Sequence, residues 1–304
     1  MAQKERVGFI GVGFMGHGMA KNIVEKGYPL TVMGHRNRKP VEDLMQRGAK
    51  EAATPADIAR LSDIVFLCVT GSPQVEALVR GESGLKAGAQ AREADLPLII
   101  ADCTTADPNS TVALARELAP LGIHFIDAPL GGTPSGAWVG KLSTMIGAEK
   151  AVFDRVAPVI ATWASKIEHI GGPGDGHKMK LLNNFLSLGY GAIYAEALSL
   201  GQKVGISPQV FDGVMRGSRM DCGFYQTFFK YVLERDRDAH KFTLNNACKD
   251  MRYLAAMADA AGIANPVGSA VKNTYATAVE SGRGEDYVPM ISDFVAQLNG
   301  TKLA

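Results

Sequence analysis

Close to its first residue the chain reads Arg6-Val7-Gly8-Phe9-Ile10, an apolar run that leads directly into Gly11-Val12-Gly13-Phe14-Met15-Gly16. Helical spacing of apolar residues follows from Met15 to Lys26, and Leu30–Met33 is a second apolar run. In such a strand–turn–helix the first glycine allows a tight turn, the second lets backbone approach a pyrophosphate, and the third lets helix and strand pack closely. We therefore expect a nicotinamide cofactor to bind at Gly11, Val12, Gly13, Phe14, Met15 and Gly16.

The overall composition is that of an ordinary globular protein. Of 304 residues, 46% are hydrophobic and 21% are charged, and the formal net charge is +1. This length predicts about two domains, and the nearly neutral charge argues against nucleic acid or an anionic membrane surface as a partner. The four cysteines lack C-x-x-C spacing, so we expect reduced thiols and no metal site.

The longest apolar stretch runs from Leu181 to Leu200 and is interrupted by Asn183, Asn184 and Glu196. These polar residues favour a core helix over a membrane span. The chain enters its first expected strand within a few residues, which leaves no room for a signal peptide. We therefore predict a cytoplasmic protein that does not contact a membrane.

The first half of the chain alternates short strands with helices. After the two strands described above, further strands are expected at Ile64–Val69, Leu98–Asp102, His124–Asp127 and Ser143–Ile146. One intervening helix has a clear start, with Thr54 as N-cap. The alternation predicts an α/β fold in which residues 1–165 form a Rossmann-type, doubly wound parallel sheet, with the ligand at the carboxyl ends of its strands.

The pattern changes at the glycine-rich turn Gly171–Gly176. Helical periodicity then runs from Asp175 to Lys203, and further helices are expected from Ser207-Pro208, over Leu244–Ala261 and over Pro266–Ser281. No strand pattern follows this turn. We therefore expect residues 166–304 to form an all-helical substrate and oligomerisation domain, joined to the first domain by one long helix.

The end of the second strand bears on the choice of cofactor. NAD sites usually place an acidic residue there for the ribose hydroxyls, but none occurs between Leu30 and Lys39. The chain instead has two arginines, Arg36 and Arg38, whose guanidinium groups match the geometry of a ribose phosphate. We favour NADP over NAD, with a solvated loop as the alternative reading of these residues.

One face of the long helix carries an unusual set of polar residues. Lys180 is followed at helical spacing by Asn183, Asn184 and Ser187, so all four share one side. Hydride transfer to a carbonyl needs a proton at its oxygen, and a lysine can supply it. Lys180 is therefore our candidate general acid/base, although a lysine extending to water is the alternative. Lys178 points elsewhere and is expected to face solvent.

Beyond these patterns, the chain resembles the β-hydroxyacid dehydrogenase family, which includes 3-hydroxyisobutyrate dehydrogenases and tartronate semialdehyde reductases. The matching segments follow the family's order and are Gly11–Asn22, Asp102–Pro108, Asp127–Ala137, Gly174–Asn184 and Phe242–Asp250. The resemblance implies an enzyme that transfers a hydride between NADP or NAD and a small β-hydroxyacid or its semialdehyde. It also implies a homodimer or homotetramer.

The resemblance assigns roles to individual residues. Lys180 would be the general acid/base, with Asn184 or Asn183 orienting the reacting oxygen. Thr104 would contact both cofactor and substrate, and Lys249 would lie beside the nicotinamide. The other implied contacts are Gly131, Gly132, Thr133, Ser187 and Arg219 for the substrate, and Val69 and Thr70 for the cofactor.

One segment departs from the family pattern. The family usually has Asp-Ala-Pro-Val-Ser-Gly-Gly, and its serine hydroxyl and backbone amides hold the substrate carboxylate. Here the serine position is Gly131 and a hydroxyl appears at Thr133, a Gly-x-Thr form that resembles the branch that reduces sulfolactaldehyde. That branch has an arginine where this chain has Gly132. A sulfolactaldehyde-type reductase with an altered anion pocket is therefore one alternative, with Arg219 as a second source of positive charge.

Two further alternatives concern the reaction itself. The first is imine reduction, whose related enzymes lack the catalytic lysine. The second is a non-catalytic sensor that uses the fold only to bind a cofactor. The presence of Lys180 with its two asparagines argues against both, because neither function needs them.

Overall fold

The structure is a computed structural model, and it describes residues 4–303. Its internal contacts divide the chain into two compact units, Met1–Lys180 and Leu181–Ala304. The division falls inside helix α9 (Asp175–Lys203). It lies beyond the boundary expected at 165/166, because strand β9 (Ala164–Gly171) still pairs with the sheet of the first unit.

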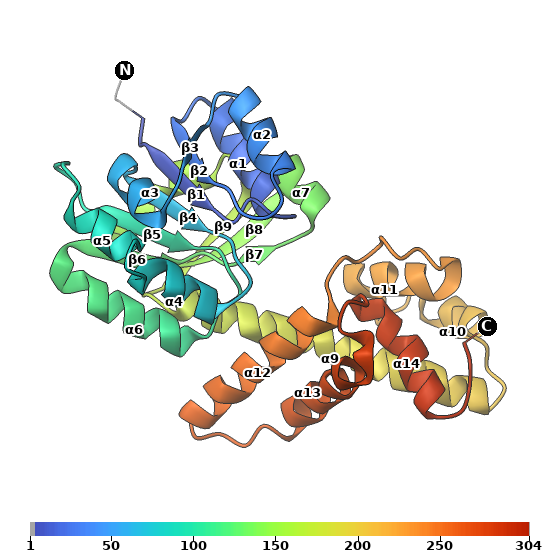
Figure 1. Cartoon of the computed structure of the whole chain (residues 1–304). Coiled ribbons are helices and arrows are strands. Elements are labelled where there is room, and N and C mark those ends of the chain that lie inside the picture. The colour runs from blue at the N-terminus through green and yellow to red at the C-terminus, as the bar shows by residue number, and fades with distance from the viewer. Residues whose placement is uncertain (1–3, 304) are drawn as a thin grey trace. The chain divides into compact units, whose positions relative to one another are not determined.

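The first unit is built on a nine-stranded sheet in the order β3-β2-β1-β4-β5-β6-β8-β7, with β9 paired to β8 (Figure 1). All six expected strands are confirmed. One is β8 (Leu142–Gly147), and the other five are β1 (Val7–Ile10), β2 (Leu30–Met33), β4 (Ile64–Leu67), β5 (Leu98–Asp102) and β6 (Ile123–Asp127). These five pair in parallel with one another and with β3 (Lys50–Ala52). The α/β, Rossmann-type fold class is therefore confirmed.

The far edge of the sheet differs from the expected parallel pattern. Strand β8 (Leu142–Gly147) runs antiparallel to β6 and to the short β7 (Leu130–Gly131). The connection from β6 to β8 contains α7 (Pro134–Trp138). Asn22 of α1 (Gly16–Glu25) holds α7 by a 2.8 Å hydrogen bond from its Nδ2 to the Ala137 carbonyl. With α7 fixed on α1, this connection does not form the sheet-covering crossover helix that a parallel strand needs.

Helices lie on both sides of the sheet (Figure 1). Alternate residues of β4 show why: Ile64 and Phe66 join one buried cluster, and Val65 and Leu67 join the other. A strand covered on both faces must be apolar throughout, which explains the continuous runs in the sequence. The helices of this unit are α1 (Gly16–Glu25), α2 (Lys39–Gln46), α3 (Pro55–Leu61), α4 (Ser72–Arg80), α5 (Leu85–Gln90), α6 (Pro108–Leu118), α7, α8 (Lys150–Ile160) and the 3₁₀ turn η1 (Ala119–Leu121).

Several helix ends follow from local sequence. Thr54 caps α3 by accepting a hydrogen bond from the Asp57 amide at 3.1 Å, and the Asp57 carboxylate accepts from the Thr54 amide, as the sequence predicts. The Ser207 hydroxyl caps α10 (Pro208–Met215) by accepting a hydrogen bond from the Val210 amide. The long helix spans Asp175–Lys203 as expected.

The second unit is helical, as predicted; between residues 181 and 303 the one β-type pairing is an isolated bridge between Thr243 and Tyr287. Its buried centre is rich in aromatic rings, with Tyr194 of α9 against Phe228 and Phe229 of α11. Besides α9, its helices are α10 (Pro208–Met215), α11 (Gly223–Glu234), α12 (Leu244–Ala260), α13 (Pro266–Ala278), α14 (Ile291–Leu298) and the short η2 (Val279–Arg283) and η3 (Val288–Met290). Over residues 4–303, no helix combines the length and the apolar character that crossing a bilayer requires.

Candidate functional site

The turn between β1 and α1 has the geometry that the glycine pattern predicts. Gly11 has φ +99°, and a Cβ there would overlap the Cys68 carbonyl oxygen. A Cβ on Gly16 would overlap the backbone of Gly11. Around Gly13, in contrast, no atom of the described chain lies within 4 Å of where a Cβ would stand. The turn is therefore closed by its first and third glycines and open at its second, which fits the pyrophosphate of a dinucleotide.

The neighbouring ends of β4 and β5 are joined by side-chain hydrogen bonds. The Thr104 hydroxyl accepts from the Val69 amide at 3.1 Å, and the Asp102 carboxylate accepts from the Thr104 amide at 2.9 Å. Asp102 is buried, which raises the pKa of its carboxyl, and its Oδ2 has no hydrogen-bond partner within residues 4–303. The structure thus brings together Val69 and Thr104, two of the residues expected to contact the cofactor.

The first turn of α9 is anchored on β6 by Asp127, a residue to which the sequence analysis gave no role. The buried Asp127 carboxylate accepts hydrogen bonds from the amides of Gly174 and His177, both at 2.6 Å. Burial raises the pKa of Asp127 to about 7. The sequence signal was present, since Asp127 follows an apolar strand at the end where polar residues collect.

His177 is a second buried residue that the sequence analysis missed. Its Nε2–H donates to the Thr104 carbonyl at 2.7 Å, and its Nδ1 shares a 2.8 Å hydrogen bond with the Thr111 hydroxyl. The side chain is fully buried. His177 therefore links the start of α9 to the loop after β5 and to α6. Its position beside the glycine-rich turn was visible in the sequence, but its partners were not.

The segment expected to hold the substrate anion follows β6. The Thr144 hydroxyl of β8 lies 3.0 Å from the carbonyl oxygens of both Ala128 and Pro129, which fixes the backbone before Gly131. Thr133 is exposed, and its hydroxyl accepts from the Gly136 amide at 3.2 Å, which caps α7. That hydroxyl also lies 2.9 Å from the Ser135 hydroxyl. Gly132, which lies between Gly131 and Thr133 in the chain, has φ +121°.

The polar face of α9 contains both buried and exposed members. Asn184 is buried, and its Nδ2 donates to the Asp250 carboxylate of α12 at 2.7 Å. Lys249 forms an ion pair with the same carboxylate at 3.1 Å. Asn183 is exposed and donates to Asn184 Oδ1 at 3.3 Å. These contacts group Asn183, Asn184 and Lys249 around the Asp250 carboxylate in the second unit.

Lys180 and Ser187 also belong to this polar face of α9, and Lys178 lies close to it in the sequence. Lys180 is partly buried and lies one helical turn before Asn184 on α9. The Ser187 hydroxyl donates to the Asn184 carbonyl at 3.2 Å. Lys178 is exposed and pairs with Asp175 at 2.9 Å, as expected for a solvent-facing residue.

The basic segment after β2 has an acidic partner that comes from a different strand. Arg38 forms two hydrogen bonds, of 2.6 and 2.8 Å, with the Glu51 carboxylate of β3, and this contact lowers the pKa of Glu51. Arg36 is exposed and makes no ion pair within the described chain, and the same holds for Arg219 between α10 and α11. The pairing of Arg38 with an acidic residue of β3 was not predicted from the sequence.

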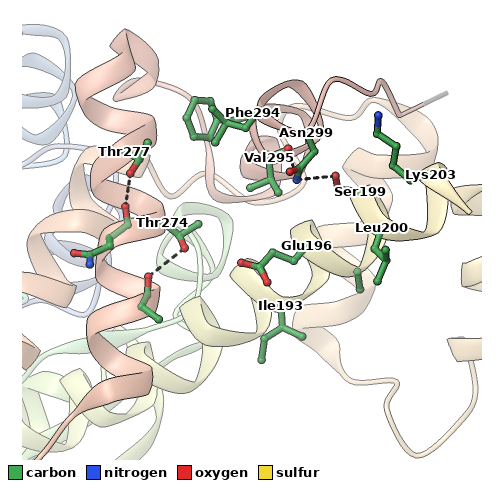
Figure 2. Close-up of a pocket in the computed structure, with 14 residues that line it drawn as sticks. Ile193, Glu196, Ser199, Leu200, Lys203, Thr274, Thr277, Phe294, Val295 and Asn299 are labelled. Carbon is green, nitrogen blue, oxygen red and sulfur yellow. Dashed lines mark hydrogen bonds between the residues drawn. The ribbon is translucent and has the colours of Figure 1, made fainter.

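The second unit contains a hollow of about 900 Å³ between α9, α13 and α14 (Figure 2). Its lining combines apolar residues such as Leu200 and Leu298 with the charged Glu196 and Lys203. None of the predicted site residues lines it. Within residues 4–303, no cluster of three or more His, Cys, Asp or Glu side chains could hold a metal ion.

Comparison with known families matches both parts of the chain. Residues 6–171 match the NAD binding domain of 6-phosphogluconate dehydrogenase. Residues 174–293 match the NAD-binding domain of NADP-dependent 3-hydroxyisobutyrate dehydrogenase.

Similar proteins span most of the chain. A 2-hydroxy-3-oxopropionate reductase from Escherichia coli (strain K12) is 34% identical, with 82% of this chain and 85% of that protein covered. A 3-sulfolactaldehyde reductase from the same organism is 28% identical, with 91% of each chain covered. The crystal structure of 3-hydroxyisobutyrate dehydrogenase from Salmonella typhimurium has the same fold, with a TM-score of 0.82 at 23% identity over 95% of this chain and 99% of that one.

Proposed function

The chain belongs to the β-hydroxyacid dehydrogenase family of NAD(P)-dependent oxidoreductases, and on that premise we propose a reaction for it in which Lys180 is the general acid/base. In this reaction a small β-hydroxyacid and its semialdehyde are interconverted. The bound nicotinamide supplies or accepts the hydride. Lys180 gives a proton to the carbonyl oxygen in reduction and removes it in oxidation.

The observation that carries this proposal is the fixed position of Asn184. A buried amide held by the Asp250 carboxylate, itself paired with Lys249, cannot rotate freely. Its Oδ1 faces Asn183, so the exposed Asn183 amide is oriented in turn. We assign Asn184, or Asn183 through it, to orienting the reacting oxygen, and Ser187 to the substrate side of the same face.

For the cofactor we propose NADP, with Arg36 as the principal contact to the 2′-phosphate. Arg38 already shares its guanidinium with Glu51, and a second anion there competes with that carboxylate. The cofactor contacts in this proposal are Gly11, Val12, Gly13, Phe14, Met15, Gly16, Arg36, Val69, Thr70, Thr104 and Lys249. Glu51 favours the alternative, NAD, because a carboxylate at this place can accept the ribose hydroxyls.

We assign the substrate's anionic group to Gly131, Gly132 and Thr133. The Thr133 hydroxyl accepts from Gly136, so its own proton can be donated either to Ser135 or to an anion. Arg219, exposed in the second unit, is a candidate counter-charge. A carboxylate and a sulfonate are both compatible with this donor set, and reduction of sulfolactaldehyde is therefore the second candidate reaction.

We further propose a homo-oligomer in which α9 meets α9 of a second copy. Met179, Leu186, Ile193 and Leu200 recur every seven residues and are all exposed, which is the spacing of a helix–helix seam. Glu196 and Lys203 flank that stripe beside the hollow (Figure 2). We place the protein in the cytoplasm, where its four free cysteines stay reduced.

One experiment tests the proposed reaction. The protein is mixed with NADPH and, separately, with a panel of C3–C4 semialdehydes that includes a sulfonated one, and loss of the reduced-cofactor absorbance is followed. Turnover of at least one carboxylate semialdehyde is expected. Turnover of the sulfonated compound alone selects the second candidate, and cofactor binding without any turnover indicates a sensor.

A further inference from the structure

Gly131 and Ser143 face each other across the edge of the sheet. They form a register pair between the antiparallel strands β7 and β8. A Cβ built on Gly131 would overlap the Ser143 Oγ, and it would lie 3.8 Å from the Ser143 Cβ, an ordinary contact distance. The Ser143 hydroxyl therefore occupies the space that a side chain at position 131 would otherwise take.

The Ser143 hydroxyl is also available for a ligand. It makes no hydrogen bond with any residue from 4 to 303, and the side chain is partly exposed. Its neighbours Leu142 and Thr144 are buried on the opposite face, as strand alternation requires. The Thr144 hydroxyl, in contrast, binds the Ala128 and Pro129 carbonyls, and the Thr133 hydroxyl accepts from the Gly136 amide and lies 2.9 Å from the Ser135 hydroxyl.

We propose that Ser143 donates a hydrogen bond to the anionic group of the substrate, beside the backbone of Gly131. The inference rests on the assignment of Gly131–Thr133 to that anion under the proposed function. A serine hydroxyl is both donor and acceptor, and its proton goes to a carboxylate or sulfonate oxygen. The glycine at 131 is then what allows the hydroxyl to reach this position from the opposite strand. Ser143 is thus a specificity-determining residue that no local motif reveals.

Two substitutions and their combination test the inference. Ser143→Ala removes the hydroxyl, and we expect the KM for the acid substrate to rise about tenfold while kcat and cofactor affinity stay near the parent values. In the double variant Gly131→Ser/Ser143→Ala the hydroxyl returns from the other strand. The 3.8 Å distance between the two Cβ positions leaves room for this hydroxyl, so we expect the KM to fall most of the way back to the parent value. Ser165→Ala, an exposed serine on β9, is the matched control.

A binding measurement separates this inference from the proposed function. Malonate is titrated into the protein saturated with NADP⁺, and its Kd is obtained from the shift of the thermal unfolding midpoint. Ser143→Ala is expected to weaken malonate binding about tenfold, whether or not the parent turns over a semialdehyde. If the parent turns over no semialdehyde but Ser143→Ala still weakens malonate binding, the proposed reaction is contradicted and the inference about Ser143 is not.

The inference is overturned by a Ser143→Ala protein whose malonate Kd stays within twofold of the parent. It is also overturned if the parent does not bind malonate, or if the double variant recovers nothing. Circular dichroism of each variant confirms that it is folded, and Ser143→Thr, which keeps the hydroxyl, must retain binding.

Discussion

Two glycine-rich turns in the first unit each lead into a helix, and they differ in what their helix N-terminus holds. The turn Gly11–Gly16 opens α1, and no atom of residues 4–303 lies within 4 Å of where a Cβ on Gly13 would stand. The turn Gly171–Gly176 opens α9, and there the Asp127 carboxylate already accepts hydrogen bonds from the amides of Gly174 and His177. A helix N-terminus attracts anions in both cases. The first turn is left open for a ligand's phosphate, whereas the second is satisfied by the protein's own carboxylate and serves to anchor the helix that carries Lys180.

The largest expected effect tests whether the anchored helix carries the chemistry. Lys180→Ala should lower kcat by about 10²–10⁴-fold, because general acid/base catalysis contributes that much. Cofactor affinity, measured by fluorescence, should persist, since the turn at Gly11–Gly16 is untouched. Lys180→Arg should not restore the rate, because guanidinium keeps its proton near neutral pH.

Lys178→Ala is the matched control for this substitution. Lys178 is exposed on the same helix and pairs only with Asp175 among the ion pairs of the described chain, so kcat should be nearly unchanged. If Lys180→Ala instead retained a rate within about threefold of the parent, the acid would lie elsewhere, with Lys249 the next candidate.

The second prediction concerns the anchor itself. In Asp127→Asn the side-chain amide offers one oxygen to two backbone donors, so either Gly174 or His177 loses its acceptor. A buried donor left without a partner costs about 1–3 kcal/mol, and the free energy of unfolding should fall by that amount in urea titrations. Asp154→Asn, an exposed carboxylate in a surface ion pair, should change it by less than about 0.5 kcal/mol.

The same variant has a signature in its pH dependence. Burial raises the pKa of Asp127 to about 7 in the folded protein, above the ordinary value of 3.8. The folded state therefore binds a proton that the unfolded state has released between about pH 4 and pH 7, so the parent loses stability as the pH rises through that window. Asp127→Asn should lack this part of the slope. Burial and the neighbouring Asp127 charge both raise the pKa of Asp102, so Asp102 keeps a smaller part of this slope in the variant.

The two turns also show how far sequence reasoning reaches. The first turn is made of contiguous backbone, so the glycine spacing together with the apolar patterns on either side of it predicted the strand, the turn, the helix and a dinucleotide ligand. The second depends on Asp127, which is 47 and 50 residues away from the amides it binds. No local pattern reports such a pairing. For the same reason Ser143 was missed as the neighbour of Gly131, because the pairing of β7 with β8 brings them together. Glu51 was missed as the partner of Arg38, because β3 pairs with β2 and Arg38 lies in the segment that follows β2.

The third prediction concerns the choice between NADP and NAD by the basic segment that follows β2. Arg36→Ala should raise the KM for NADP about tenfold or more, because it removes one charge-assisted hydrogen bond to the 2′-phosphate. The KM for NAD, which lacks this phosphate, should change little. Arg38→Ala should have a smaller effect on NADP, because Arg38 is already paired with Glu51. Equal changes for both cofactors in Arg36→Ala, or a parent that prefers NAD, would refute the assignment.

The smallest expected effect belongs to Thr133, whose hydroxyl serves structure and substrate at once. Thr133→Val removes the cap of α7, which costs about 1 kcal/mol of stability. It also removes a donor to the substrate anion, and the KM should rise about two- to fivefold. This is less than for Ser143→Ala, because the Thr133 hydroxyl already forms a hydrogen bond with the Ser135 hydroxyl. Thr133→Ser keeps both roles and should leave both quantities near the parent. A Thr133→Val protein that loses stability while its KM for every substrate stays unchanged would show that the hydroxyl only caps the helix.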